Sequence, residues 1–141
     1  MREYLPKSSH ITTIEKVEMR LKEARKNLER LDEDDRITLL EGDAIEVLKE
    51  LLIKEKSYDF IFMDAAKGQY LHWLPLLLKL MPPGGVLISD NVLQDGDIVE
   101  SRFAVQRRNR TIHSRMREYL HTLKHMEEFE TDVIPIGDGV T

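Results

Sequence analysis

Cysteine is absent from the 141-residue sequence, which excludes disulfide bonds and thiolate chemistry. No apolar run approaches the roughly 20 residues that a membrane-spanning helix needs, and the first residues, Met1–Pro6, lack the apolar core of a signal peptide. We therefore expect a cytoplasmic protein with no membrane partner. The length predicts one domain over residues 1–141, because a chain of this size buries about 70% of its unfolded surface around a single core.

Acidic residues outnumber basic ones, and the net charge of −5 argues against a general affinity for nucleic acids. The segment from residue 102 to residue 124 is an exception, because it has seven basic residues and one acid, Glu118. The seven are Arg102, Arg107, Arg108, Arg110, Arg115, Arg117 and Lys124. Such a segment is commonly the solvated face of a helix, but this excess is larger than i,i+4 ion pairs explain. A polyanionic substrate is the alternative interpretation.

Short apolar segments alternate with segments of helical periodicity along the chain. The predicted strands are His10–Glu15, Arg36–Leu40, Phe60–Met63, Val86–Ser89 and Phe129–Ile136. Apolar residues at helical spacing follow three of these strands. After the first strand they are Val17, Leu21, Ala24, Leu28 and Leu31, and after the second they are Ile45, Leu48, Leu51 and Leu52. After the fourth they are Ile112, Met116, Tyr119 or Leu120, Leu123 and Met126. This alternation predicts an α/β fold with a doubly wound, largely parallel sheet and right-handed crossovers.

Three connecting segments have weaker patterns. Gln69–Met81 has helical periodicity, but Pro75 removes a backbone donor inside it, so we expect a kink or a late helix start. Asp32–Asp35 is expected to form a polar turn, and Val92–Glu100 is expected to form a loop.

Three predicted strands end in acids, which are Glu15, Asp64 and Asp90. Ligands collect outside the carboxyl ends of strands in doubly wound sheets, so these acids could converge along one edge. Asp64, Asp90 and Asn91 offer only oxygen ligands, which suit a hard cation such as Mg²⁺, Mn²⁺ or Ca²⁺. Each acid alone could simply cap the helix that follows, but the set together with Lys67 favours a site.

Four positions, Glu15 and Lys67 among them, each allow a functional and a structural interpretation. Glu15 could accept hydrogen bonds from ribose hydroxyls or be solvated. Asp43 could read an adenine edge or cap a helix, with Glu46 as its capping-box partner. Lys67 could be a general base if a nearby cation lowers its pKa, or an exposed lysine at a helix start. Tyr70 is expected in the core, where it could also line the site.

Six motifs in order along the chain resemble one known family. They are Thr12–Glu15, Glu41–Ala44, Asp59–Tyr70, Pro83–Gly85, Ser89–Leu93 and Ile134–Gly139. The chain is similar to the class I S-adenosylmethionine-dependent O-methyltransferases, in the branch of caffeoyl-CoA and catechol O-methyltransferases. Within the branch it resembles most the bacterial tRNA 5-hydroxyuridine methyltransferases, partly because of the basic run Arg107–Arg110. The resemblance implies a Rossmann-like methyltransferase sheet.

The resemblance also implies roles for particular residues. The metal ligands would be Asp64, Asp90 and Asn91, and the catalytic residues would be Lys67 and Asp64. The cofactor would be bound by Glu15, Asp43, Ala44, Asp64 and Tyr70. RNA would be bound by Arg107, Arg108 and Arg110. Glu15 would bind the cofactor ribose, and Lys67 would help to deprotonate a substrate hydroxyl. The implied acceptor is tRNA 5-hydroxyuridine or, second, a catechol-like small molecule, and the implied assembly is a homodimer.

The resemblance leaves two parts of the family pattern without a counterpart. The family's first strand, which carries a glycine-rich loop under the cofactor, should precede Thr12, and its last strand should continue from Val140. The expected sheet is therefore incomplete, with a gap between the strands that end at Glu15 and Asp64 and with unpaired backbone groups there. Two alternatives stay open: an inactive fragment that self-associates or binds RNA, and a metal-dependent phosphohydrolase with Asp64 as nucleophile.

Overall fold

The computed structural model describes residues 2–31 and 35–141. The chain divides into two compact units, Met1–Lys54 and Glu55–Thr141, and each is described by itself. The expectation of a single domain stays a prediction. No helix in the described part of the chain is long and apolar enough to cross a membrane.

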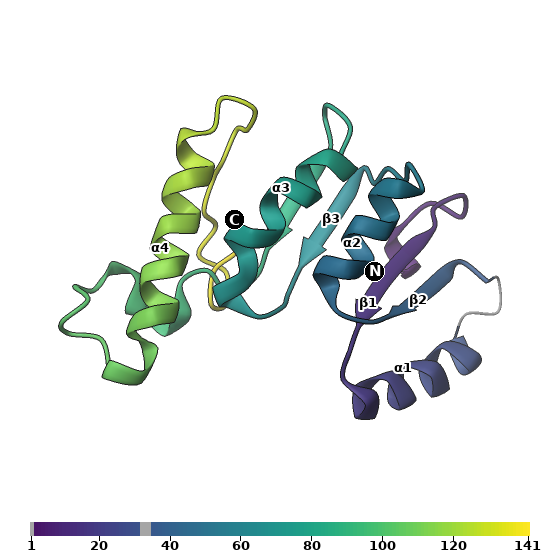
Figure 1. Ribbon diagram of the computed structural model, residues 1–141, viewed down its shortest axis with the longest axis horizontal. Coiled ribbons are helices and arrows are strands. Elements are labelled where there is room, and N and C mark those ends of the chain that lie inside the picture. Colours follow the sequence, from purple (N-terminus) through teal and green to yellow (C-terminus); the bar gives the residue numbers. More distant parts are fainter. Residues whose placement is uncertain (1, 32–34) are drawn as a thin grey trace. The chain divides into compact units, whose positions relative to one another are not determined.

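The first unit is built on two parallel strands. Its elements are a 3₁₀ turn η1 (Arg2–Tyr4), β1 (Ile11–Glu15), α1 (Glu18–Leu31), β2 (Ile37–Glu41) and α2 (Ala44–Ile53), as Figure 1 shows. The register runs from Ile11 opposite Ile37 to Glu15 opposite Glu41, so both predicted strands are confirmed within a residue. Residues 32–34 of the predicted polar turn, and the side chain of Leu31, lie outside the described residues.

The core of the first unit comes mainly from α2. Its buried side chains are Leu21 of α1 and Val47, Leu48 and Leu51 of α2. The predicted stripe of α1 is only partly covered, because Val17 is 40% exposed. In α2 the buried face includes Val47, which the predicted stripe omitted, because the face of a helix is wider than one row of residues.

The second unit contains the other parallel strand pair. Its elements are β3 (Phe60–Met63), the 3₁₀ turn η2 (Lys67–Gln69), α3 (Tyr70–Leu80), β4 (Val86–Ser89), the 3₁₀ segments η3 (Gln94–Val99) and η4 (Arg107–Asn109), and α4 (Arg110–His125). β3 and β4 pair in parallel from Phe60 opposite Val86 to Met63 opposite Ser89. The described strands thus form two separate two-stranded sheets, one in each unit.

α3 and α4 supply most of the core of the second unit. The buried side chains are Tyr70, Leu74, Leu77 and Leu80 of α3 and His113, Met116, Tyr119 and Leu123 of α4. The rings of Tyr70 and Tyr119 meet edge to face at 5.3 Å. In α4 the buried face uses His113 where the sequence predicts Ile112, which is 42% exposed. The late helix start that Pro75 suggested is wrong, because α3 begins at Tyr70 and Pro75 lies inside it.

Two sequence predictions about connecting segments are wrong. Phe129–Ile136 does not form a strand, since only an isolated bridge joins Ile134 to Val140. The segment contains Pro135, which has no N–H, and polar residues, which suit a paired inner strand poorly. The predicted loop Val92–Glu100 contains the 3₁₀ segment η3, Gln94–Val99, which Asp95 and Gly96 interrupt with φ of 54° and 88°.

Candidate functional site

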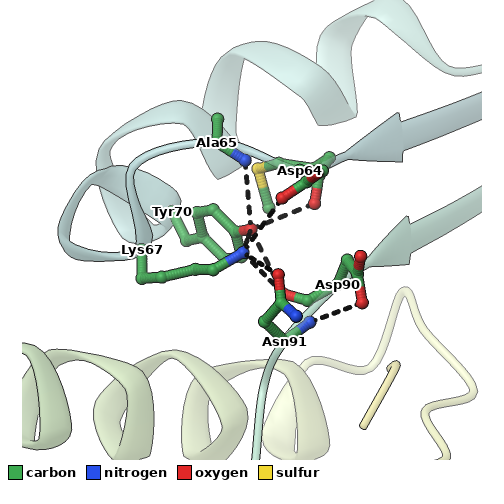
Figure 2. Close-up of polar contacts among 7 residues, drawn as sticks. Asp64, Ala65, Lys67, Tyr70, Asp90 and Asn91 are labelled. Atoms are coloured by element: carbon green, nitrogen blue, oxygen red, sulfur yellow. Dashed lines mark hydrogen bonds and ion pairs between the residues drawn. The ribbon is translucent and has the colours of Figure 1, made fainter. Parts of the chain in front are cut away.

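Asp64 and Asp90 directly follow two neighbouring strands. β3 and β4 are parallel, and Met63 at the end of β3 is opposite Ser89 at the end of β4. The amide of Asp90 donates to the carbonyl of Met63 at 3.0 Å. Because parallel strands present their carboxyl ends at one edge, Asp64, Asp90 and Asn91 gather there, as Figure 2 shows.

The ammonium group of Lys67 lies among these residues (Figure 2). Its Nζ donates to Asn91 Oδ1 at 2.7 Å, to Asp64 Oδ1 at 3.1 Å and to the carbonyl of Asp90 at 3.2 Å. The hydroxyl oxygen of Tyr70 is 3.1 Å from the same nitrogen. An ammonium group has three donors, so the four oxygens share them. We call Lys67 with Asp64, Tyr70, Asp90 and Asn91 the lysine cluster.

Tyr70 belongs both to the core and to the site, as the sequence interpretation allows. Its side chain is fully buried. The hydroxyl accepts from Lys67 and from the amide of Ala65 at 3.4 Å. The carbonyls of Met63 and Asp90 lie 3.1 and 3.3 Å away as acceptors for its one proton. Tyr70 therefore ties the ends of β3 and β4 to the start of α3.

A tight turn places Asn91 in the lysine cluster. Its φ of 53° is in the left-handed region, which asparagine tolerates better than most residues. The carboxylate of Asp90 accepts the amide N–H of Asn91 at 2.7 Å and so stabilises this turn. The side chain of Asn91 then reaches Lys67, while the carboxylate of Asp90 stays with the backbone.

The surroundings of Lys67 favour its charged form. Burial lowers the pKa of Lys67, but the hydrogen bond to Tyr70 and the carboxylate of Asp64 outweigh burial and raise the pKa above the ordinary 10.5. Lys67 is therefore an ammonium group at neutral pH in this arrangement. Its role as a general base, which requires a nearby cation to lower its pKa, stays a prediction.

The oxygens around Lys67 have the chemistry that a hard cation requires. Carboxylate, amide and carbonyl oxygens are the ligands of Mg²⁺ and Ca²⁺. Asp64 and Asn91 already direct oxygens at one positively charged group, so the residues present fit a cation. The described residues contain no group of three or more His, Cys, Asp or Glu side chains placed for a metal. A cation here would therefore depend on the amide of Asn91.

Glu15 ends β1 in the first unit and caps the turn that follows. Its Oε1 accepts the amide protons of Lys16 and Val17, each at 2.8 Å, and its Oε2 is 3.6 Å from Arg20. The amide of Val17 contributes most to lowering the pKa of Glu15, against the opposing effect of burial, and Lys16 and Arg20 add to it. Glu15 therefore holds the backbone of the turn before α1, and ribose binding stays a prediction.

Asp43 is the N-cap of α2, as predicted. Its carboxylate accepts the amide of Ile45 at 3.0 Å and the ammonium of Lys16 at 3.1 Å. Lys16 contributes most to lowering the pKa of Asp43, followed by the amide of Ile45. The predicted capping box is wrong, because Glu46 directs its carboxylate to Lys49 at 2.8 Å, one turn away along the helix.

The predicted site residues thus fall into two groups. Glu15, Asp43 and Ala44, the first residue of α2, belong to the first unit. The lysine cluster belongs to the second unit, and the structure brings its members together. The cofactor-binding roles of both groups stay predictions.

The arginines of the basic segment have two different environments. Arg107 and Arg108 are exposed on η4. Three others donate to backbone carbonyls: Arg110 to Val105 and Phe103, Arg115 to Gly68, and Arg117 to Ile98 and Glu100. Part of the positive charge therefore holds loops in place. Arg110 is thus bound to the backbone, whereas Arg107 and Arg108 are exposed and are the better candidates for contact with RNA.

One contact that supports the site was not predicted. The hydroxyls of Ser89 and Tyr119 are 2.6 Å apart, and both residues are fully buried. This hydrogen bond joins the end of β4, next to Asp90, to α4. The available signal was a tyrosine within an apolar stripe, since a buried tyrosine hydroxyl usually finds a partner.

The family model described as O-methyltransferase matches residues 1–141. The chain belongs to the O-methyltransferase family. This O-methyltransferase sequence is 32% identical over 138 residues to tapetum-specific methyltransferase 1 of Arabidopsis thaliana, and the match covers 97% of this chain and 59% of that protein. It is 38% identical over 112 residues to caffeoyl-CoA O-methyltransferase of Medicago sativa, and the match covers 77% of this chain and 45% of that protein.

Solved structures confirm the fold class of this O-methyltransferase chain. An O-methyltransferase of Bacillus cereus, solved in complex with SAH, superposes with a TM-score of 0.83 at 25% identity. The superposition covers 96% of this chain and 62% of that one. The fold is thus the α/β methyltransferase fold with parallel strands, and the chain spans less than two thirds of the length of these relatives.

Proposed function

We propose that this chain forms part of an S-adenosylmethionine-dependent O-methyltransferase that methylates a hydroxyl group and uses a divalent cation, with Mg²⁺ the first choice and Mn²⁺ or Ca²⁺ as alternatives. The observation that carries the proposal is the convergence of oxygens from Asp64 and Asn91 on one positively charged group at the ends of β3 and β4. Membership of the O-methyltransferase family supports the reaction type. The SAH complex of the Bacillus cereus relative supports the cofactor.

In this proposal, the lysine cluster prepares the substrate hydroxyl. Asp64, Asp90 and Asn91 would hold the cation, which would lower the pKa of the hydroxyl. Lys67, which lies beside Tyr70 in the cluster, would receive the hydroxyl proton after its own proton has passed to solvent, a loss that a nearby cation favours by lowering the pKa of the lysine. The oxygen forms a bond to the methyl carbon while the bond from that carbon to the sulfonium sulfur breaks. In-line placement of the two reactants then supplies much of the rate, with an effective molarity of ~10⁵ M or more.

Cofactor binding is the first test of this function. Calorimetric titration of the chain with S-adenosylmethionine, with and without Mg²⁺, should show binding. Glu15→Gln should weaken it, because the amide cannot accept both ribose hydroxyls as a carboxylate does. Glu18→Gln, a change of an exposed acid in the same unit, is the matched control. Absence of binding, or equal effects of both variants, would contradict the cofactor site.

We propose tRNA 5-hydroxyuridine as the methyl acceptor, with a catechol-like small molecule as second choice. The exposure of Arg107 and Arg108 supports the first choice. The names of the caffeoyl-CoA O-methyltransferase relatives support the second. Transfer of labelled methyl groups from S-adenosylmethionine to tRNA and to catechol, measured side by side with Mg²⁺ present, separates the two. Transfer to neither substrate class by this chain or a full-length relative would contradict both.

Arg107 and Arg108 allow a separate test of RNA contact. If each contacts a phosphate, Arg107→Ala with Arg108→Ala should lower the slope of log affinity against log salt concentration by about one or two. Lys49→Ala with Lys54→Ala removes the same charge from exposed positions on or beside α2 and should leave the slope unchanged. An unchanged slope in the arginine variant would exclude the phosphate contacts.

A second candidate function is that of an inactive, self-associating piece. It is favoured by the exposure of Phe60, Phe62 and Val86 on the β3–β4 pair, at 42%, 43% and 49%, because an isolated two-stranded sheet is marginally stable. Sedimentation equilibrium tests this candidate together with the homodimer that we propose. Self-association without cofactor binding would favour the inactive piece, and a cofactor-binding dimer would favour the enzyme.

A further inference from the structure

Lys67 places a positive charge on the same oxygens that the proposed cation would use. Its nitrogen is 2.7 Å from Asn91 Oδ1 and 3.1 Å from Asp64 Oδ1 (Figure 2). Mg²⁺ binds oxygen at about 2.0–2.1 Å, so a cation on Asn91 Oδ1 would lie within about 5 Å of the ammonium nitrogen. At such a distance in a partly buried site the two charges repel strongly.

The side chains of the cluster differ in their freedom to move. The side chain of Asp64 is 55% exposed, so a cation can reach its carboxylate from solvent. The side chain of Lys67 is 21% exposed and starts at the first residue of the short turn η2. Tyr70, in contrast, is fully buried within α3. Lys67 is therefore the member that can leave while the others stay.

We propose that Lys67 and the divalent cation compete for the oxygens of Asp64 and Asn91. In the arrangement described above, the ammonium group lies on these two oxygens and compensates the carboxylate of Asp64. Binding of the cation displaces the ammonium group toward solvent. The inference rests on the proposed metal site and adds to it that Lys67 is released only when that site is filled.

Chemical labelling of the unmodified chain tests the displacement directly. Acylation by an N-hydroxysuccinimide ester, followed by peptide mass spectrometry, gives a rate for each lysine. Without metal, Lys67 should react more slowly than Lys49 and Lys54, whose side chains are 54% and 60% exposed. Saturating Mg²⁺ should raise the rate at Lys67 several-fold and leave the two control lysines unchanged.

Cation affinity gives the second measurement. Lys67→Met should bind Mg²⁺ at least about tenfold more tightly than the unmodified chain in calorimetry, because no charge-assisted hydrogen bonds have to be broken first. Arg115→Met is the matched control: it removes one positive charge from a group that donates to the carbonyl of Gly68, next to Lys67, but vacates no cluster oxygen. Its effect should be less than about threefold, as for an exposed charge.

The possible results separate this inference from the proposed metal site. Faster labelling of Lys67 with Mg²⁺, together with a larger gain in affinity for Lys67→Met than for Arg115→Met, supports the competition. Mg²⁺ binding with unchanged or slower labelling, or with equal gains in both variants, overturns the competition and leaves the metal site standing. No Mg²⁺ binding by any of the three chains overturns both. If Lys67→Met does not fold, the labelling result alone decides.

Discussion

The buried hydrogen bond between Ser89 and Tyr119 should be one of the larger single contributions to the stability of the second unit. The two hydroxyls are 2.6 Å apart, and neither side chain is exposed to solvent. Tyr119→Phe keeps the aromatic ring against Tyr70 but leaves the hydroxyl of Ser89 without its partner. An unsatisfied buried hydroxyl costs about 1–3 kcal/mol, and we expect this loss in the free energy of unfolding at pH 7.

The double variant shows whether the two hydroxyls act as a pair. Ser89→Ala alone should cost a similar amount, because it leaves the hydroxyl of Tyr119 buried and unpaired. Ser89→Ala with Tyr119→Phe removes both polar groups, so its cost should be smaller than the sum of the single costs by about 1 kcal/mol or more. Tyr4→Phe, at a residue that is 89% exposed, is the control and should change little.

The same pair predicts a loss of stability at alkaline pH. Burial raises the pKa of Tyr119 to about 12, although the hydrogen bond with Ser89 partly offsets this. The folded-state pKa is above the ordinary 10.0. The contribution of the neutral Tyr119 hydroxyl to the free energy of unfolding is therefore complete below pH 10 and is lost as the pH rises from 10 through 12. A shift of two pKa units corresponds to about 3 kcal/mol at most.

Urea unfolding followed by circular dichroism at pH 7, 9 and 11 provides the assay, since the slope with denaturant also checks that the transition stays two-state. The unmodified chain should lose more stability than Tyr119→Phe between pH 9 and 11. The difference between the absorbance of these two chains near 295 nm, which reports the ionised form of Tyr119, should titrate near pH 12. Additive costs in the double variant, within about 0.5 kcal/mol, would refute the pairing. Equal alkaline losses in both chains would refute the raised pKa.

Two further variants test local features of each unit. Gly139→Ala should destabilise the second unit far more than Gly137→Ala in urea unfolding. Both glycines have positive φ, 78° and 59°, but an added Cβ at Gly139 would clash with the side chain of Leu93, whereas at Gly137 it would meet nothing within 4 Å. Equal effects would contradict the clash. Glu15→Gln should lower the free energy of unfolding at pH 7 by well under 1 kcal/mol, and this loss should be smaller at pH 3. The pKa of Glu15 is held below its ordinary 4.5, chiefly by the amide of Val17, so the contribution of its carboxylate is present above pH 4.5 and is lost as the pH falls through the lowered value. A loss as large at pH 3 as at pH 7 would contradict this reasoning.

Local patterns in the sequence were enough to place the strands and the acids at their ends. The apolar run Phe60–Met63 and the glycine turn before Val86 predict β3 and β4 within a residue. The spacing of Asp43 from the stripe of α2 predicts its N-cap. These features depend on neighbours along the chain, where backbone geometry and side-chain type act directly. Phe129–Ile136 was mispredicted because a strand also requires a partner strand.

Only the tertiary structure decided which side chains share the site. The contacts of Lys67 with Asn91 and of Ser89 with Tyr119 join residues 24 and 30 positions apart, and they depend on how η2 and α4 pack against the ends of β3 and β4. The same holds for the arginines of the basic segment, two of which donate to backbone carbonyls of distant loops. Sequence determined the residue types that gather at this edge, since strand periodicity places them there. Packing determined that a lysine, itself a cation, meets the oxygens, because side-chain partners distant in sequence are selected by shape and charge in three dimensions.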